Sequence, residues 1–303
     1  MHILRQTHDR NMRHPALLAC LLLLTHSALG QEVFGTFLAA SPATLSRPHD
    51  LALSADGRLV FVADLGNNAV TVLDAGTLRV AGTIGKGELS APHDVHLDRA
   101  GRLLVADTGN DRIAVYAVNG AEGKLVSEIR DGISGPEGVA EGADGTLYVV
   151  NTPRDHVVAL RDGRKILEAG ATGKKDNQYN RPHDVEVDAQ GNIYVVDSGN
   201  DRIQVLNREL KAVRVIGGVP FNFNDPKYLF IDTQGWLYVA DQRTSRIKIL
   251  NAEYRPVGVI GSIQAGAGPG QLNNPEGVLV HGDRIWISDT YNNRVVLYSL
   301  GRH

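Results

Sequence analysis

Six positions in this chain, each directly after a proline, hold the side chains best suited to chemistry. The prolines recur at nearly constant intervals of 44, 44, 46, 44 and 49 residues, at Pro48, Pro92, Pro136, Pro182, Pro226 and Pro275. The residues that follow them are, in order, His49, His93, Glu137, His183, Lys227 and Glu276. If each proline starts an equivalent structural unit, these six side chains occupy equivalent places and form one ring.

The histidines and glutamates of this ring are candidate metal ligands. Three imidazoles, or two imidazoles and a carboxylate, suit Zn²⁺ or another divalent cation with one coordination position left open. Every second unit contributes His93, His183 and Glu276, which would be arranged with near three-fold spacing, whereas His49 lies in the other alternating set. The sequence contains no phosphate-binding loop and predicts no organic cofactor.

The aspartates that directly follow the histidines have two interpretations. Asp50, Asp94 and Asp184 would orient the imidazole rings if they accept hydrogen bonds from them. Alternatively, Pro-His-Asp is only a connector of the repeat. Each imidazole would then hydrogen-bond the neighbouring backbone, and each aspartate would cap the next turn.

The segments between the prolines predict short antiparallel strands. Residues 182–217 contain strand patterns at 184–187, 193–196, 202–206 and 211–216, separated by turns that contain Gly and Asn. Repetition of this pattern with a period in the forties is typical of propeller blades. The last unit has only three such strands, and residues 33–39 supply one more upstream of the first proline. We therefore predict an all-β fold, a six-bladed β-propeller of four-stranded antiparallel blades closed by the N-terminal strand.

An aspartate and an arginine five residues apart recur at the second turn of the units. The pairs are Asp107 with Arg112, Asp197 with Arg202, Asp241 with Arg246, and Asp289 with Arg294. Such a pair across a turn can form a partly buried ion pair that holds the hairpin, and its recurrence favours a structural role over a catalytic one. The first and third units lack the arginine.

Residues 1–30 have the features of a secretory signal peptide. A basic stretch precedes an apolar run over residues 16–24, and the small residues Ala28 and Gly30 follow. We predict cleavage after Gly30, an exported protein located in the periplasm or outside the cell, and a single propeller domain over residues 31–303. Cys20 is the only cysteine, so residues 31–303 can form neither a disulfide nor a thiolate metal site.

The charge of residues 31–303 argues against two classes of partner. These residues include 28 basic and 33 acidic side chains. The small negative balance argues against nucleic acid, or a membrane after cleavage of the signal, as the main partner. We expect a monomer that binds a small-molecule, peptide or protein ligand.

The repeat itself resembles a known family. The stretch PHDVEVDAQGNIYVVDSGNDRIQV, residues 182–205, resembles the NHL repeat, and the resemblance extends over nearly all of residues 31–303. It is strongest in the second, fourth and sixth units. NHL-repeat proteins form six-bladed propellers that serve many unrelated functions.

A more distant resemblance is to an NHL enzyme, the peptidyl-α-hydroxyglycine amidating lyase. Its zinc histidines are similar to the post-proline positions of every second blade, which implies His93 and His183 here, with Glu276 as the third member. Its tyrosine in a turn resembles Tyr291, although Tyr291 lies in a unit that also supplies a candidate ligand. The disulfides of the lyase have no counterpart in residues 31–303.

These patterns lead to two functional hypotheses. The leading one is an exported NHL propeller that binds a ligand or protein at the mouth of its channel, with a His/carboxylate metal site as an optional part. The alternative is a zinc-dependent lyase of the amidating type. In that case Tyr291 would act as the base, and Arg47 or Arg181, each just before a Pro-His pair, would hold a substrate carboxylate.

Overall fold

Twenty-four β-strands make up most of residues 32–302, the part of the chain that the computed structural model describes. The predicted signal peptide, residues 1–30, lies outside the described residues. Within residues 32–302, no helix is long and apolar enough to span a membrane.

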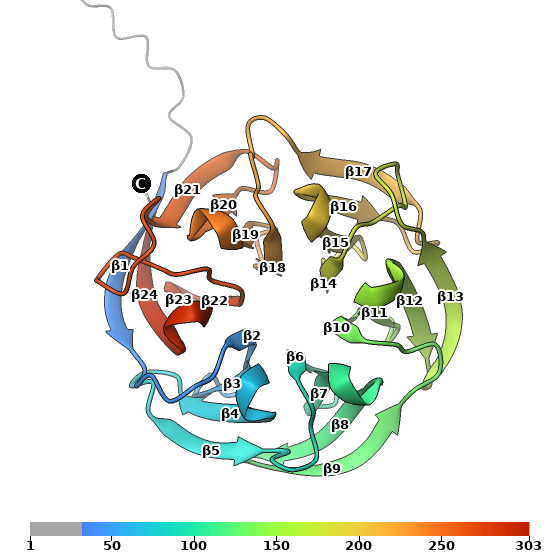
Figure 1. Cartoon of the computed structure of the whole chain (residues 1–303), viewed down its shortest axis with the longest axis horizontal. Helices are drawn as coiled ribbons and strands as arrows, with labels where there is room; N and C mark the ends of the chain where they lie inside the picture. Colours follow the sequence, from blue (N-terminus) through green and yellow to red (C-terminus); the bar gives the residue numbers. More distant parts are fainter. Residues whose placement is uncertain (1–31, 303) are drawn as a thin grey trace, which may run out of the picture. The chain divides into compact units, whose positions relative to one another are not determined.

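Four of the sheets have four strands each, in chain order. They are β2 (Pro48–Leu53), β3 (Leu59–Asp64), β4 (Ala69–Asp74) and β5 (Val80–Ile84); β6 (Pro92–Leu97), β7 (Arg102–Asp107), β8 (Arg112–Asn119) and β9 (Glu122–Ile129); β10 (Pro136–Glu141), β11 (Leu147–Asn151), β12 (His156–Arg161) and β13 (Arg164–Gly170); β14 (Pro182–Val187), β15 (Ile193–Asp197), β16 (Arg202–Leu206) and β17 (Ala212–Gly217). All neighbouring strands in them are antiparallel. The first strand of each lies nearest the middle of the molecule (Figure 1).

The fifth sheet has eight strands and contains the N-terminal strand. Its order is β18 (Pro226–Ile231), β19 (Leu237–Asp241), β20 (Arg246–Leu250), β21 (Pro256–Gly261), β1 (Val33–Ala40), β24 (Arg294–Arg302), β23 (Arg284–Asp289) and β22 (Val278–His281). The strand predicted over residues 33–39 is thus present as β1. It pairs antiparallel with β24, from Val33 opposite Arg302 to Ala40 opposite Val296. It meets β21 at a single parallel pair, Val33 and Gly258.

The apolar core lies between neighbouring sheets rather than at the centre of the ring. Phe61 of β3 packs with Val95 of β6 and Tyr116 of β8 in one such layer. The first and last units are in contact in the same way, because Leu51 packs in a layer with Trp286. Each sheet thus packs a face against the neighbouring sheet. The fold is an all-β propeller of four-stranded antiparallel blades, as predicted.

Each second strand ends in a single turn of 3₁₀ helix, where the sequence predicted only a turn. These turns are η1 (Leu65–Asn67), η2 (Thr108–Asn110), η3 (Thr152–Arg154), η4 (Ser198–Asn200), η5 (Gln242–Thr244) and η6 (Thr290–Asn292). In four of them the first residue is a Thr or Ser whose hydroxyl donates to the carbonyl of the proline that starts the next unit, as Thr152 does to Pro182 at 2.7 Å. These bonds fix the start of one inner strand to the turn of the preceding unit.

Three of the four predicted aspartate–arginine pairs are confirmed. Nε of Arg112, Arg202 and Arg294 lies 2.7, 2.7 and 2.8 Å from the paired, fully buried carboxylate. The prediction for Asp241 and Arg246 was wrong, because Asp241 pairs with Lys248 at 2.7 Å. Asp241 and Arg246 are opposite one another in the β19–β20 ladder, but Lys248, two residues on and therefore on the same face of the strand, contacts the carboxylate instead. Thr71 and Gln204 bond their aspartates from the equivalent position in other units.

His96 is a structural residue of β6, in line with its position in a predicted strand. Its Nε2 accepts a hydrogen bond from the amide of Glu141 at 3.2 Å, which links β6 to the end of β10. Burial lowers the pKa of His96 to about 4. The imidazole is therefore a neutral acceptor at physiological pH.

The aspartate–arginine pairs generate a prediction with an internal control. Arg202→Met removes the guanidinium from a buried carboxylate, so we expect a loss of about 2–4 kcal/mol in the free energy of unfolding. Arg246→Met, at the equivalent position of the next unit, removes no ion pair of the described residues and should cost less than about 1 kcal/mol. Urea unfolding of both variants measures the difference, and equal losses would contradict the role of the pair.

A second prediction concerns acid stability. The pKa of His96 is depressed from an ordinary value of 6.5 to about 4. The unfolded chain therefore binds the extra proton first, and stability falls as the pH drops from about 6.5 to about 4. Between pH 7 and pH 4, wild type should lose about 2–3 kcal/mol more than His96→Gln, whose amide can still accept the bond. Urea unfolding at both pH values tests this, and parallel losses in the two proteins would refute it.

Candidate functional site

The imidazoles of His49 and His183 and the carboxylate of Glu276 converge on one point. We call these three residues the histidine–glutamate group. Their ligand-type atoms all lie within 4.8 Å of one another, and all three residues are buried. Nε2 of His49 is 2.9 Å, and Nε2 of His183 3.6 Å, from the same oxygen, Oε2 of Glu276. Nε2 of His183 has no hydrogen-bond partner among the described residues, and neither has Oε2 of Glu276 apart from its 2.9 Å contact with His49.

His93, which the alternating-unit prediction placed in the metal set, lies outside this group. Its ring packs edge-on against His49, with 4.8 Å between the centroids. Its Nδ1 is 2.7 Å from the hydroxyl of Thr108, and its Nε2 is 3.9 Å from Oε1 of Glu137. Nδ1 of His93 also lies 3.0 Å from the carbonyl oxygen of Ala91, the same contact that Nδ1 of His49 makes with Arg47, so the two rings differ in the glutamate that Nε2 faces. The structure instead brings His49 into the set.

The backbone at the start of each inner strand accounts for the convergence. The residue before each of the six prolines has a left-handed φ, between 48° and 54°, and the proline then fixes the next φ near −65°. Gly277 permits a particularly close approach. A Cβ there would lie 2.3 Å from the carbonyl oxygen of His49, so only glycine lets this backbone pack against β2 and bring Glu276 to His49.

Hydrogen bonds to Nδ1 fix the orientation of both imidazoles. Nδ1 of His49 lies 2.9 Å from the carbonyl oxygen of Arg47, which can only accept, so Nδ1 carries a proton. Nδ1 of His183 lies 2.5 Å from Oε2 of Glu137, an equivalent arrangement with a carboxylate. Both rings therefore present Nε2 to Glu276.

The charges of the ring positions are strongly coupled. Burial alone would lower the pKa of His183, but the Glu137 carboxylate raises it above its ordinary value. Burial opposes ionisation of Glu137, yet the neighbouring His183 imidazole lowers its pKa to about 2. Burial likewise opposes ionisation of Glu276, but His49 and His183 lower its pKa well below the ordinary range. Both glutamates are therefore carboxylates at neutral pH.

Burial has the opposite effect on His93. Together with the His49 imidazole, it lowers the pKa of His93 to about 4, so this ring is neutral at physiological pH.

Gln242 is a site residue that the sequence reasoning missed. It takes the first place in η5, where four other units have Thr or Ser. Its Nε2 donates to Oε1 of Glu276 at 2.5 Å, so the carboxylate is held with Oε2 facing the two imidazoles. The sequence does indicate Gln242, because this unit has Gln where four other units have Thr or Ser.

Tyr228 is a second missed residue, at the position after Lys227. Its hydroxyl lies 3.0 Å from the carbonyl oxygen of His93 and 3.1 Å from that of Glu137, and its ring is 5.1 Å from that of His183. Burial raises the pKa of Tyr228 well above its ordinary value, so the hydroxyl stays a donor. The signal was again a departure from the repeat, because Tyr replaces the Asp of the Pro-His-Asp units.

None of the three residues predicted as catalytic contacts the histidine–glutamate group through its side chain. Tyr291 is 56% exposed. Arg181 is exposed, and its guanidinium lies 3.4 Å from Asp225. Arg47 contributes its carbonyl to His49, while its exposed side chain has no ion pair among residues 32–302.

Two of the aspartates predicted to orient the imidazoles have another role. Asp94 accepts from the amide of Val139 at 2.5 Å, and Asp184 accepts from the amide of Leu229 at 2.8 Å. Each bond crosses to the next unit, so the prediction was wrong for these two carboxylates. The side chain after each histidine points away from the imidazole, as alternate residues of a strand do, and meets the neighbouring inner strand.

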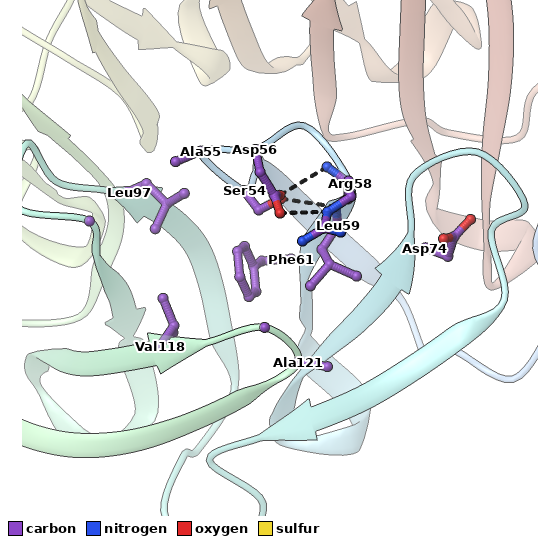
Figure 2. A pocket seen from close by; sticks show the side chains of 12 residues that line it. Ser54, Ala55, Asp56, Arg58, Leu59, Phe61, Asp74, Leu97, Val118 and Ala121 are labelled. Atoms are coloured by element: carbon purple, nitrogen blue, oxygen red, sulfur yellow. Dashed lines mark hydrogen bonds and ion pairs between the residues drawn. The ribbon is translucent and has the colours of Figure 1, made fainter.

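The described cavities lie away from the histidine–glutamate group. One of about 460 Å³ is bounded by Asp50, Asp94 and Glu186 together with apolar residues of the inner strands. A larger cleft, of about 580 Å³, lies between the first two units (Figure 2). Figure 2 shows its apolar side, with Phe61 and Val118, and the hydrogen-bonded Ser54, Asp56 and Arg58 at its edge. Neither cavity is lined by the three residues of the group.

Comparison with known proteins identifies the family. Residues 76–255, more than half of the chain, match the family described as "Lactonase, 7-bladed beta-propeller". The chain belongs to this family, and its repeats are of the NHL type. The seven blades are part of the family's description, whereas the described residues form four four-stranded sheets and one eight-stranded sheet.

Two curated relatives share the repeat. NHL repeat-containing protein 3 of Homo sapiens is 32% identical over 181 residues, which cover 54% of this chain and 50% of the relative. The Mus musculus protein of the same name is 28% identical over 184 residues, covering 58% and 43%. The chain thus spans half or less of the length of the curated relatives it matches.

Solved structures with the same fold include lyases. A streptogramin B lyase aligns with a TM-score of 0.59 and 15% identity, over 90% of this chain and 98% of that chain. Virginiamycin B lyase from Staphylococcus aureus aligns with a TM-score of 0.60 and 12% identity, over 89% and 99%. A protein of unknown function from Bacteroides thetaiotaomicron aligns with a TM-score of 0.68 and 13% identity, over 90% and 76%. At these identities the likeness concerns the fold alone.

Proposed function

We propose that this protein is an exported NHL-type propeller that binds a ligand at the mouth of its channel through a divalent cation held by His49, His183 and Glu276. The observation that carries the proposal is the convergence of three buried donor atoms, those of His49, His183 and Glu276, within 4.8 Å of one another. Buried polar atoms are normally satisfied, and Nε2 of His183 has no hydrogen-bond partner among the described residues, which supports a missing partner at this point. The proposed export rests on the N-terminal sequence features described above.

The donor chemistry fits a metal ion such as Zn²⁺. When both imidazoles are neutral with protons on Nδ1, their Nε2 lone pairs face a carboxylate oxygen, and a cation between them offsets this repulsion. In the metal-free protein a proton on Nε2 of His183 has the same effect, which agrees with the raised pKa of His183. Two imidazoles and a carboxylate are a common zinc ligand set, and the contact between Glu137 and His183 is the carboxylate–histidine arrangement found behind such ligands. A bound cation would supply a Lewis acid for a ligand oxygen. The protein's own residues fix the orientation of that ion's ligands.

We also propose six blades. The eight-stranded sheet divides at the single Val33–Gly258 pair into β18–β21 and a unit of β22, β23, β24 and β1. In the second unit the N-terminal strand takes the outer place beside β24, which would close the ring between the two ends of the described chain.

The geometry favours binding over the alternative, a zinc lyase of the amidating type. A lyase would need Tyr291 as a base within reach of the metal. The side chain of Tyr291 is 56% exposed and does not contact the histidine–glutamate group, and neither does the exposed side chain of Arg47. The lyase remains a second candidate because two imidazoles and one carboxylate leave a coordination position free.

The metal proposal is tested by ring variants. We expect residues 31–303, purified without chelator or histidine tag, to contain about one divalent ion per chain. His183→Ala and His49→Ala should each lower zinc affinity by more than about 100-fold without unfolding the propeller, because each removes a ligand. His93→Ala is the matched control, since it changes a ring histidine outside the group, and it should alter zinc affinity by less than about tenfold. Elemental analysis and competition with a zinc indicator give these values.

Two results would count against this set of ligands. Loss of metal from His93→Ala but not from His49→Ala would restore the alternating set of His93, His183 and Glu276. A metal-free wild type that takes up no zinc, nickel or manganese would refute the metal site.

Gln242 should act as a positioning residue for Glu276. Gln242→Thr introduces the residue type found at this place in other units and removes the amide that holds Oε1. We expect zinc affinity to fall by about tenfold, since supporting contacts of this kind typically matter by 10–100-fold, while the free energy of unfolding changes by less than about 1 kcal/mol. Zinc titration and urea unfolding of the same samples separate the two effects. A variant that loses stability but keeps wild-type zinc affinity would show Gln242 to be structural only.

A further inference from the structure

Lys227 is the only lysine at the six ring positions, and its ammonium makes few direct contacts. The residue is only 7% exposed. Among the described residues its ammonium has a single ion-pair partner, Oδ1 of Asp225 at 3.4 Å. A buried ammonium has three donors and a large desolvation cost, so one distant carboxylate oxygen leaves most of its capacity unused.

Asp225 is shared among three cations. Arg181 approaches the same Oδ1 at 3.4 Å, and Arg243 approaches Oδ2 at 3.2 Å. Three positive charges share this carboxylate, and they outnumber the nearby carboxylates even when Glu137, whose pKa Lys227 helps to lower, is counted. All three contacts are longer than the 2.7–2.9 Å of a strong charge-assisted hydrogen bond. Neither guanidinium has another ion-pair partner in residues 32–302.

The cluster of Lys227, Arg181 and Arg243 lies at the same end of the channel as the histidine–glutamate group. Lys227 directly follows one of the six repeated prolines, as His183 does. Tyr228, the next residue, packs against the imidazole of His183. Arg181 lies two residues before His183, and Arg243 follows Gln242, which contacts Glu276. The guanidiniums of Arg181 and Arg243 are more than half exposed, so a ligand can reach them from solvent.

We infer that Lys227, Arg181 and Arg243 form a subsite for the carboxylate of a small organic acid, beside the histidine–glutamate group. The inference rests on the proposed function in so far as the channel mouth is taken as the ligand-binding end. Asp225 already occupies the inner side of the cluster as a carboxylate, which shows that the cluster accommodates this group. A ligand carboxylate on the outer side would restore charge balance, and the planar guanidiniums match its two oxygens.

The subsite can be tested with propionate, with its neutral amide as the matched ligand. NMR titration of residues 31–303 should show saturable binding of propionate and none of propionamide at the same concentrations. Lys227→Met and Arg243→Gln should each weaken propionate binding by about tenfold or more, because each removes a charge that faces the ligand. Arg161→Gln neutralises an exposed guanidinium paired with Asp144 elsewhere and should bind propionate like wild type. Arg243→Gln keeps the test valid if Lys227→Met does not fold.

Several results would overturn the inference. These are wild-type propionate binding in both Lys227→Met and Arg243→Gln, equal binding of propionamide, and no binding of propionate to wild type. Binding of inorganic phosphate with no binding of propionate would also overturn it, because the anion would then not be a carboxylate.

The experiment is run on EDTA-treated and on zinc-supplemented protein, so that the two proposals can fail separately. Binding of propionate that depends on Lys227 in a protein that takes up no metal would refute the metal site and support the subsite. Uptake of zinc with no propionate binding in either sample would refute the subsite and leave the metal site standing.

Discussion

The hydrogen bonds that join neighbouring units at the start of their inner strands, four of them from a hydroxyl, are the constraint on which the rest of the structure depends. A hydroxyl in the turn of one unit holds the carbonyl of the next proline, and buried carboxylates such as Asp184 hold amides of the next inner strand. Both kinds of bond hold backbone groups, so they fix the position at which an inner strand begins. The ring positions are the first side chains after these fixed points. Their mutual distances therefore follow from contacts between units, and a change in one unit is transmitted to its neighbours.

Repetition explains why much of this could be predicted from the sequence. The spacing of six prolines, together with the strand patterns between them, predicted four-stranded antiparallel blades, and the N-terminal strand was placed correctly beside the final unit. The geometry of the ring was less accessible. Membership of the ring follows from spacing, but the contact of His49 with Glu276 depends on the close backbone approach at Gly277. The pairing of Asp241 with Lys248 was missed because two residues on one face of a strand can contact the same carboxylate, and spacing does not decide between them.

The departures from the repeat, rather than its consensus, mark the proposed site. In a repeat protein, equivalent positions of the units pack in similar surroundings. A residue that differs in one unit is therefore not required by the fold as a whole. Gln242 replaces a hydroxyl residue and contacts Glu276, and Tyr228 replaces an aspartate and packs on His183. Lys227 replaces a histidine or glutamate and contributes the only lysine of the ring. These three departures lie in one unit, in β18 and η5.

This asymmetry gives the ring two halves of opposite character. On one side, carboxylates and imidazoles face one another with two buried atoms unsatisfied, an arrangement that a cation would stabilise. On the other side, three cations share a single carboxylate, which an anion would stabilise. Each half is incomplete by itself, and its buried charges, such as that of Lys227, are retained only where some partner offsets their desolvation. A ligand whose carboxylate lies against the cations and whose further oxygen binds a metal ion in the histidine–glutamate group would satisfy both halves at once. Recognition of this ligand would then depend on the distance between the two charged sites rather than on a preformed apolar pocket.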